Sequence, residues 1–144
     1  MQGNTDGSKV WFDPIGVLVQ PGQTIRWVNR DPGNSHTATA YHPKNFEHAH
    51  RIPEGATPWN SDYLLPNETF SLTLTAAGVY DYFCIPHEHA GMVGRIIVDH
   101  LVGVGMPKLR DPGASPNTQL VPEAAQRAFP AVEDILRQGI NRRM

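Results

Sequence analysis

The chain has 144 residues, of which 40% are apolar and 18% charged, and its net charge at pH 7 is −2. This length suits one domain with an appendage, and it is sufficient to bury a core without disulfide or metal cross-links. The balanced charge argues against a nucleic-acid-binding protein, which usually carries a basic surface.

Residues 1–8 are polar and rich in glycine, so we expect a frayed start. They contain neither a basic nor an apolar stretch, so no signal peptide is expected, although an exported protein expressed without its signal would look the same. No apolar run approaches the roughly 18 residues that a membrane span needs. Cys84 is the single cysteine, which excludes an internal disulfide framework.

Short β-like runs separated by turn residues occupy the chain from Lys9 to about Asp99. The clearest has Phe70, Leu72 and Leu74 on one face, with the period of two that is typical of a strand. Seven or so short strands predict an all-β sandwich or barrel. The runs cover residues 10–12, 15–20, 24–29, 37–41, 70–75, 79–84 and 92–99.

Residues 42–67 interrupt this pattern and are rich in His, Pro and Asn, which predicts a long irregular loop. We expect Trp59 and Tyr63 to pin this loop to the sandwich. The loop also contains His42, His48 and His50, and three histidines so close in sequence are a candidate for a weak second metal site. The alternative, which is far commoner, is solvated loop histidines.

After His100 the composition changes, so we divide the chain into a domain of residues 1–100 and a segment of residues 101–144. Glycine and proline predict an extended linker first, and residues 122–140 then have helical periodicity. Pro130 should interrupt the helix and Gly139 should end it. Its apolar face either packs on the chain's own sandwich or docks a partner subunit, which would give an oligomer. The apolar positions are Ala124, Ala125, Ala128, Phe129, Val132, Ile135, Leu136 and Ile140.

The segment from Tyr80 to Gly94 places Cys84, His87 and Met92 on a loop between two predicted strands. A thiolate, an imidazole and a thioether suit copper, and electron-transfer copper sites add a second histidine. His36 follows a turn and precedes a strand, so it is the candidate for that second histidine. The alternatives are a small buried hydrophobe for Cys84 and core filler for Met92. Tyr80 and Tyr82 are expected to be packing residues, one of them a tyrosine corner.

With these ligand candidates and the early segment from Phe12 to Asn29, residues 9–99 resemble the cupredoxins, specifically the plastocyanin-like small blue copper proteins. The resemblance does not cover residues 101–144. It implies a Greek-key β-sandwich of seven to eight strands and one type 1 copper held by His36, Cys84, His87 and Met92. It further implies an electron carrier in a periplasm or other extracytoplasmic compartment, with redox partner proteins docking near His87. The family often has asparagine after the first histidine ligand, where this chain has Thr37, so the tie between the two ligand segments is left open.

Two other functions remain as hypotheses. Copper storage or delivery to a larger cuproenzyme is motivated by His42, His48 and His50. An enzyme would need an open coordination position for substrate, whereas Met92 supplies a fourth donor, so we do not expect catalysis. His89 is either an exposed loop histidine or a residue that tunes the nearby copper or contacts a partner.

Overall fold

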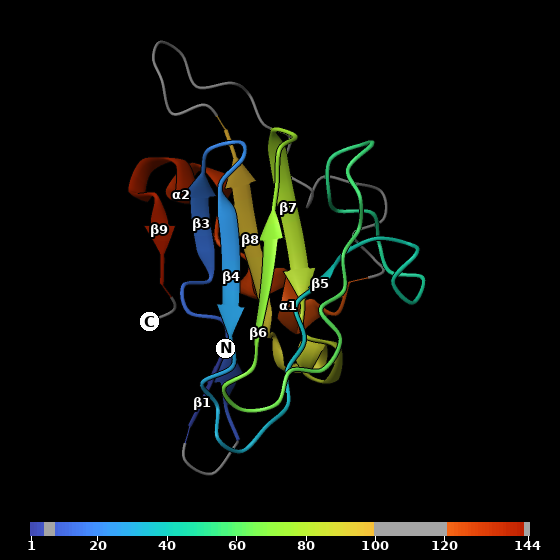
Figure 1. Cartoon of the computed structure of the whole chain (residues 1–144), viewed down its shortest axis with the longest axis vertical. Coiled ribbons are helices and arrows are strands. Elements are labelled where there is room, and N and C mark those ends of the chain that lie inside the picture. Colours follow the sequence, from blue (N-terminus) through green and yellow to red (C-terminus); the bar gives the residue numbers. More distant parts are fainter. Residues whose placement is uncertain (5–7, 100–120, 143–144) are drawn as a thin grey trace.

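The computed structural model describes residues 1–4, 8–99 and 121–142, and the predicted linker lies outside them, apart from its end at residue 121. Figure 1 shows two layers of strands, with helices behind them. The strands are β1 (Gln2–Gly3), β2 (Val10–Trp11), β3 (Gly16–Val19), β4 (Thr24–Val28), β5 (Thr39–Ala40), β6 (Thr69–Thr73), β7 (Gly78–Phe83), β8 (Val93–Val98) and β9 (Ile140–Asn141). The helices are the 3-10 helix η1 (Ile85–Ala90) and the α-helices α1 (Glu123–Ala128) and α2 (Val132–Gln138).

The larger sheet has the strand order β5-β7-β8-β3-β9, and β4 pairs with β6 in front of it (Figure 1). β3 runs parallel to β8, and the other pairings are antiparallel. The strands expected from residues 10–12 to 92–99 are all present with slightly different ends. The expectation of an all-β sandwich is therefore confirmed.

The main core lies between the two layers. Trp27 of β4 meets Tyr82 of β7 edge to face, with ring centroids 5.3 Å apart. Tyr80 is also buried, and its hydroxyl donates a 2.6 Å hydrogen bond to the backbone carbonyl of Ala76, four residues earlier. This is the expected tyrosine corner, which fixes the turn into β7.

Two short strands were not expected from the sequence. Gln2 and Gly3 pair with Trp11 and Val10, so the expectation of a frayed start at residues 1–8 is wrong for residues 2–3. At the other end, Ile140 pairs with Val17 instead of extending the helix, and the residue is 52% exposed. Helical periodicity placed Ile140 on the apolar face, whereas Gly139 ends the helix just before it.

The C-terminal helices cover the side of the larger sheet away from β4 and β6 (Figure 1). Val132 and Ile135 of α2 pack on Val79 and Ile97, which explains why β7 and β8 are buried on both faces. Ala125, Ala128 and Phe129 pack in a second cluster with Tyr41 and Phe83, so most of the apolar positions that suggested an oligomer contact the chain's own domain. The predicted break at Pro130 is confirmed, because it separates α1 from α2.

A buried ion-pair group joins the sheet to the segment between the helices. Asp81 of β7 accepts hydrogen bonds from Arg51 and Arg95. Arg95 also donates to the carbonyl of Pro130, and both guanidinium groups lie within 5 Å of the Phe129 ring centroid. Burying these charges is tolerable because they are paired and hydrogen-bonded.

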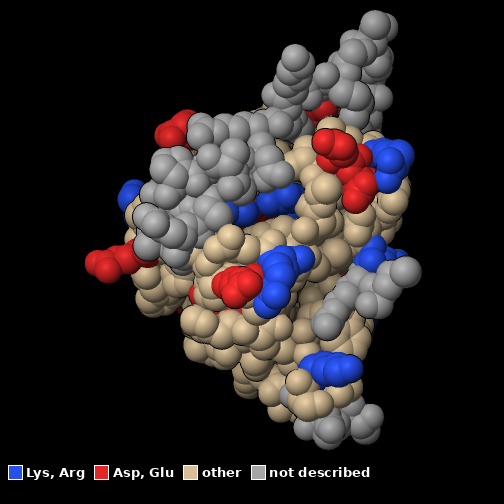
Figure 2. Space-filling model, turned by 180° about the vertical axis from the view of Figure 1, so that it is seen from behind, with Lys and Arg blue, Asp and Glu red and all other residues tan. Residues whose placement is uncertain are grey.

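Acidic and basic side chains lie side by side on the helical face (Figure 2), in keeping with the exposed pairs Glu123–Arg127 and Asp134–Arg137. The described part of this face has no extended basic area. None of the described helices has the length and apolar character needed to cross a membrane.

Residues 42–67 form the predicted long loop, held to the rest by the isolated bridges His36–Leu64 and Thr39–Asn60. Trp59 is 6% exposed and does pin the loop to the core. Tyr63 is 56% exposed, so the same expectation for Tyr63 is wrong.

Candidate metal centre

The loop between β7 and β8 is a closed turn that brings its two ends together. Cys84 follows β7 directly and is fully buried, and its N–H donates to the carbonyl of Met92 at 3.0 Å. Within the turn, His87 N–H donates to the Cys84 carbonyl and Met92 N–H to the His87 carbonyl, both at 3.1 Å. Met92 is fully buried where β8 begins, and His87 is half-buried.

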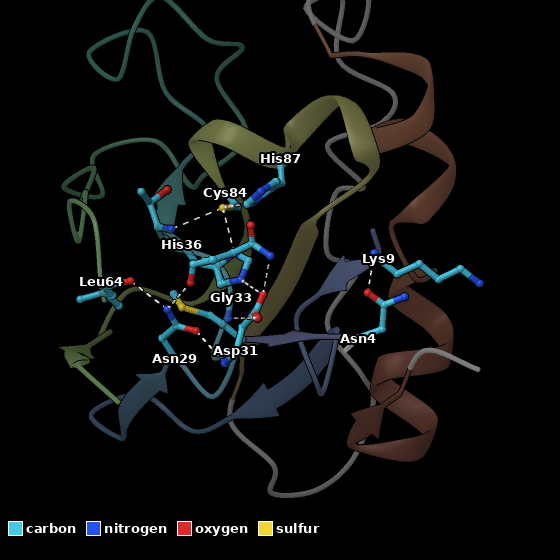
Figure 3. Close-up of polar contacts among 12 residues, drawn as sticks. Asn4, Lys9, Asn29, Asp31, Gly33, His36, Leu64, Cys84 and His87 are labelled. Atoms are coloured by element: carbon cyan, nitrogen blue, oxygen red, sulfur yellow. Dashed lines mark hydrogen bonds and ion pairs between the residues drawn. The ribbon is translucent and has the colours of Figure 1, made fainter. Parts of the chain in front are cut away.

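His36 reaches the same place from the segment between β4 and β5. Its backbone pairs with Leu64 through two hydrogen bonds of 2.8 and 3.2 Å, and its side chain is fully buried. The Cys84 Sγ atom lies 3.6 Å from His36 Nδ1 and 3.3 Å from His87 Nδ1 (Figure 3). Within the described parts of the chain, these three residues are the group of His, Cys, Asp and Glu whose ligand atoms converge within 4.8 Å.

Asp31 sets the orientation of His36. Its Oδ2 atom lies 2.8 Å from His36 Nε2, and both side chains are fully buried (Figure 3). Nε2 therefore carries the ring proton and donates a hydrogen bond to the carboxylate, which leaves the Nδ1 lone pair facing Cys84. Burial pushes the pKa of Asp31 up, but hydrogen bonds from Gly33, Asn34 and His36 outweigh this and lower it.

Both imidazoles at the centre favour the neutral form that a metal ligand needs. Burial lowers the pKa of His36, against the opposing effect of Asp31. Burial also lowers the pKa of His87, and the neighbouring His36 adds to this. Burial raises the pKa of the Cys84 thiol to about 11, so the site must supply positive charge before the thiolate forms.

Thr37 connects the two segments that carry the candidate ligands. It occupies the position after His36 where the family often has asparagine. Its Oγ1 accepts a 2.8 Å hydrogen bond from the N–H of Ile85, and its own N–H points at Cys84 Sγ from 3.4 Å. Thr37 is fully buried. The threonine therefore connects the segment of His36 to the start of η1 through one side-chain and one backbone contact.

The donor set fits copper. One thiol, two neutral imidazoles and a nearby buried thioether combine soft and borderline donors, which is the chemistry that selects copper over hard cations. The fit rests on the convergence of Cys84 Sγ with the Nδ1 atoms of His36 and His87, none of which faces a carboxylate.

The histidines of the long loop do not assemble into one metal site. The rings of His42 and His50 lie 4.9 Å apart, but His42 Nδ1 already accepts a hydrogen bond from the N–H of Lys44. His48 points elsewhere and pairs with Glu88. The predicted second site at His42, His48 and His50 is therefore wrong as a three-histidine cluster, and His89 is an exposed residue of η1.

Sequence patterns missed two residues around this centre. In the sequence Asp31 belongs only to the turn before His36, and its role as the group that orients this histidine follows from their 2.8 Å contact. Glu88 has no signal in the sequence, because a charged loop residue is usually solvated, whereas its side chain is only 7% exposed in the fold.

Comparisons with known proteins agree with this geometry. The model of a family described as copper binding proteins, plastocyanin/azurin family, matches residues 1–99. The chain is 40% identical over 100 residues to the chloroplastic plastocyanin of Chlamydomonas reinhardtii, a match that spans 65% of this chain and 61% of that one. It is 36% identical over 97 residues to the plastocyanin of Scenedesmus fuscus, which covers 65% of this chain and 91% of that one.

Solved structures extend the likeness toward the C-terminus. A pseudoazurin from Sinorhizobium meliloti superposes with a TM-score of 0.58 at 28% identity, covering 94% of this chain and 88% of that one. A pseudoazurin from Methylobacterium extorquens AM1 shares the fold, with a TM-score of 0.59 at 19% identity. The family model ends at residue 99 and the plastocyanins match 65% of the chain, as expected from the sequence. The structural match to the pseudoazurin covers 94% of the chain and therefore extends beyond residue 99.

Proposed function

Because this chain belongs to the plastocyanin/azurin family of copper-binding proteins, we propose that it is a type 1 copper electron carrier. The ligands would be His36, Cys84, His87 and Met92. When bound there, one copper ion supplies a one-electron couple between Cu(II) and Cu(I). No substrate bond is made or broken, so the protein is a carrier and not an enzyme.

One observation carries this proposal: three donor atoms from two distant segments of the chain converge within 4.8 Å of one another. His36 is held by Asp31, and Cys84 is held by the N–H of Thr37. The turn that carries His87 closes on Met92 through backbone hydrogen bonds. A ligand set fixed in this way needs little rearrangement when the charge of the site changes, and this is the property that an electron carrier requires.

His87 is the proposed point of electron exit. It is half-buried, whereas His36, Cys84 and Met92 are fully buried. Its exposed neighbours on η1 include Pro86 and Ala90, which offer a small apolar surface to a partner. We propose that redox partner proteins dock there through a brief, small interface, below about 1,200 Å² in total.

We also propose an extracytoplasmic setting, such as a periplasm. The support is the family membership together with the chemistry of Cys84, a thiol that metal loading would protect from oxidation. Fractionation of the source cells, with the protein detected by antibody, tests the setting directly.

The carrier can be separated experimentally from copper delivery. The loaded protein should take up one electron per chain from a small reductant and return it to an oxidant over repeated cycles without losing copper. Transfer of most of the copper to a metal-free acceptor protein would instead favour delivery. The three-histidine cluster that motivated delivery is not assembled, so no observation at the site favours it.

A further inference from the structure

Glu88 is a buried carboxylate in the turn that carries His87. It is the one buried side chain of η1, and only 7% of that side chain is exposed. Its neighbours Pro86, His89 and Ala90 are all exposed. Burying a carboxylate is costly unless it is paired and hydrogen-bonded, so its partners must hold it firmly.

Both carboxylate oxygens of Glu88 have partners from residues 41–48. The hydroxyl of Tyr41 donates a 2.7 Å hydrogen bond to Oε2. His48 Nε2 lies 3.0 Å from Oε1. Tyr41 is fully buried and His48 is mostly buried. The turn is thus attached to the long loop through two side chains that lie more than 35 residues earlier in the sequence.

The geometry of His48 indicates which protons it holds. Its Nδ1 lies 2.7 Å from the carbonyl oxygen of Asn45, an atom that can only accept. Its Nε2 faces the carboxylate of Glu88. Two acceptors around one ring require both nitrogens to donate, which is the imidazolium form. The ring also stacks on Phe83, with centroids 4.1 Å apart, and Phe83 directly precedes Cys84.

The start of the turn is restrained separately, because the N–H of Ile85 donates to Thr37 Oγ1 and the N–H of His87 donates to the Cys84 carbonyl. Six residues of 3-10 helix have poor hydrogen-bond geometry and do not persist without support. Its C-terminal end depends on Gly91 N–H, which donates to the Glu88 carbonyl at 2.9 Å, and on Met92 N–H, which donates to the His87 carbonyl. Movement of Glu88 would therefore loosen the backbone that follows His87, from Glu88 to Met92.

We propose that Glu88, clamped by the Tyr41 hydroxyl and the His48 imidazolium, is the positioning residue that fixes the turn bearing His87. The proposal rests on the proposed function, since it assigns to this network the placement of the half-buried ligand. Glu88 and His48 act through His87 and do not themselves bind the metal.

The test compares Glu88→Gln, His48→Gln and Tyr41→Phe with Glu123→Gln, an exposed position on α1, and His50→Gln, on the same loop as His48. In the metal-free protein, hydrogen exchange should be about tenfold faster or more at Gly91 and Met92 in the three network variants. The amides of β8 should be unchanged, and so should both controls. In the wild type, the NMR spectrum of His48 should show two ring N–H groups.

The reduction potential of the copper-loaded protein distinguishes a positioning role of Glu88 from a purely electrostatic one. Tyr41→Phe changes no charge, and the Glu88→Gln/His48→Gln double variant removes one charge of each sign. Positioning predicts that the reduction potential is shifted in both, relative to the wild type and the controls. A wild-type potential in both variants, or wild-type exchange at Gly91 and Met92, would overturn the proposal.

Two other outcomes, a wild type that takes up no copper and variants that do not fold, still allow the proposal to be tested. If the wild type takes up no copper, the proposed function fails, and the exchange data on the metal-free protein still decide whether the clamp exists. If the Glu88 and His48 variants fail to fold, Tyr41→Phe keeps the aromatic packing and loses only the hydroxyl, so its exchange rates decide the question.

Discussion

Asp31 Oδ2 lies 2.8 Å from His36 Nε2, and neither side chain is exposed to solvent. The carboxylate also accepts hydrogen bonds from the N–H of Gly33 and the side-chain amide of Asn34. These bonds fix Asp31 within the turn that precedes His36. The turn thereby orients His36, a candidate ligand that lies 48 residues before Cys84 in the sequence.

Replacing Asp31 with asparagine should destabilise the metal-free protein by about 1 to 3 kcal/mol, because buried charge-assisted hydrogen bonds are lost. The reduction potential of the copper protein should rise, since a negative charge near the site is removed. Denaturant unfolding and voltammetry measure the two effects. Asp62→Asn, at an exposed loop position, is the matched control, and equal effects in both variants would refute the assigned role.

Thr37→Val tests the tie between the ligand segments. Valine keeps the shape but leaves the Ile85 N–H without the acceptor it has at 2.8 Å, which should cost about 1 to 3 kcal/mol of unfolding free energy. Thr73→Val breaks an exposed hydroxyl pair with Thr24 and should change stability by less than about 0.5 kcal/mol. Equal stability losses would show that the buried hydrogen bond does not matter.

Gly91→Ala tests the contact between η1 and α1. Gly91 has a φ of +84°, and an added Cβ would lie 3.3 Å from the carbonyl oxygen of Ala124. Gly55 has a similar φ of +81° with nothing within 4 Å, so Gly55→Ala reports the backbone strain alone, about 1 to 2 kcal/mol. Gly91→Ala should cost more than this in thermal or denaturant unfolding. No excess loss would mean that α1 does not restrain the turn.

The stability of the metal-free protein should depend on pH through His48. Its pKa is raised above the ordinary 6.5, first by the hydrogen bond to Glu88, with burial opposing and the Glu88 charge and the carbonyls of Asn45 and Phe46 adding to the rise. A raised folded-state pKa gives stability that is full below pH 6.5 and is lost as the pH rises through the folded value.

Unfolding free energies of the wild type and His48→Gln between about pH 5 and 9 measure this contribution. Their difference should be constant on the acid side and shrink above the unfolded pKa of His48. Taking the difference removes the contributions of the other titrating groups that both proteins share. A difference that grows with pH would contradict the assigned charge state of His48.

The sequence predicted the ligand loop because its spacing is local: Cys84, His87 and Met92 lie within one turn, and their order alone indicates copper chemistry. The strands were also predictable, since alternation such as Phe70 and Leu72 is a local pattern. Ile140 was misassigned because helical periodicity continued across Gly139, and only the pairing with Val17 reveals the strand.

The surroundings of the site could not be predicted in the same way. The partners of Glu88 lie 40 and 47 residues earlier, and the acceptor of the Ile85 N–H lies 48 residues earlier. No local pattern indicates contacts at such separations. The sequence does not distinguish a buried glutamate from a solvated one. The burial of Glu88 becomes visible only in the fold, where Tyr41 and His48 contact it.

The most direct test of the copper centre is a titration of the metal-free protein with Cu(II), followed by visible absorption, beside a Cys84→Ser variant. We expect an intense blue or green band that saturates at one copper per chain and is absent from the variant, because the band arises from the thiolate bond to copper. A pale spectrum that is the same in both proteins would contradict this expectation and would place the copper on other histidines.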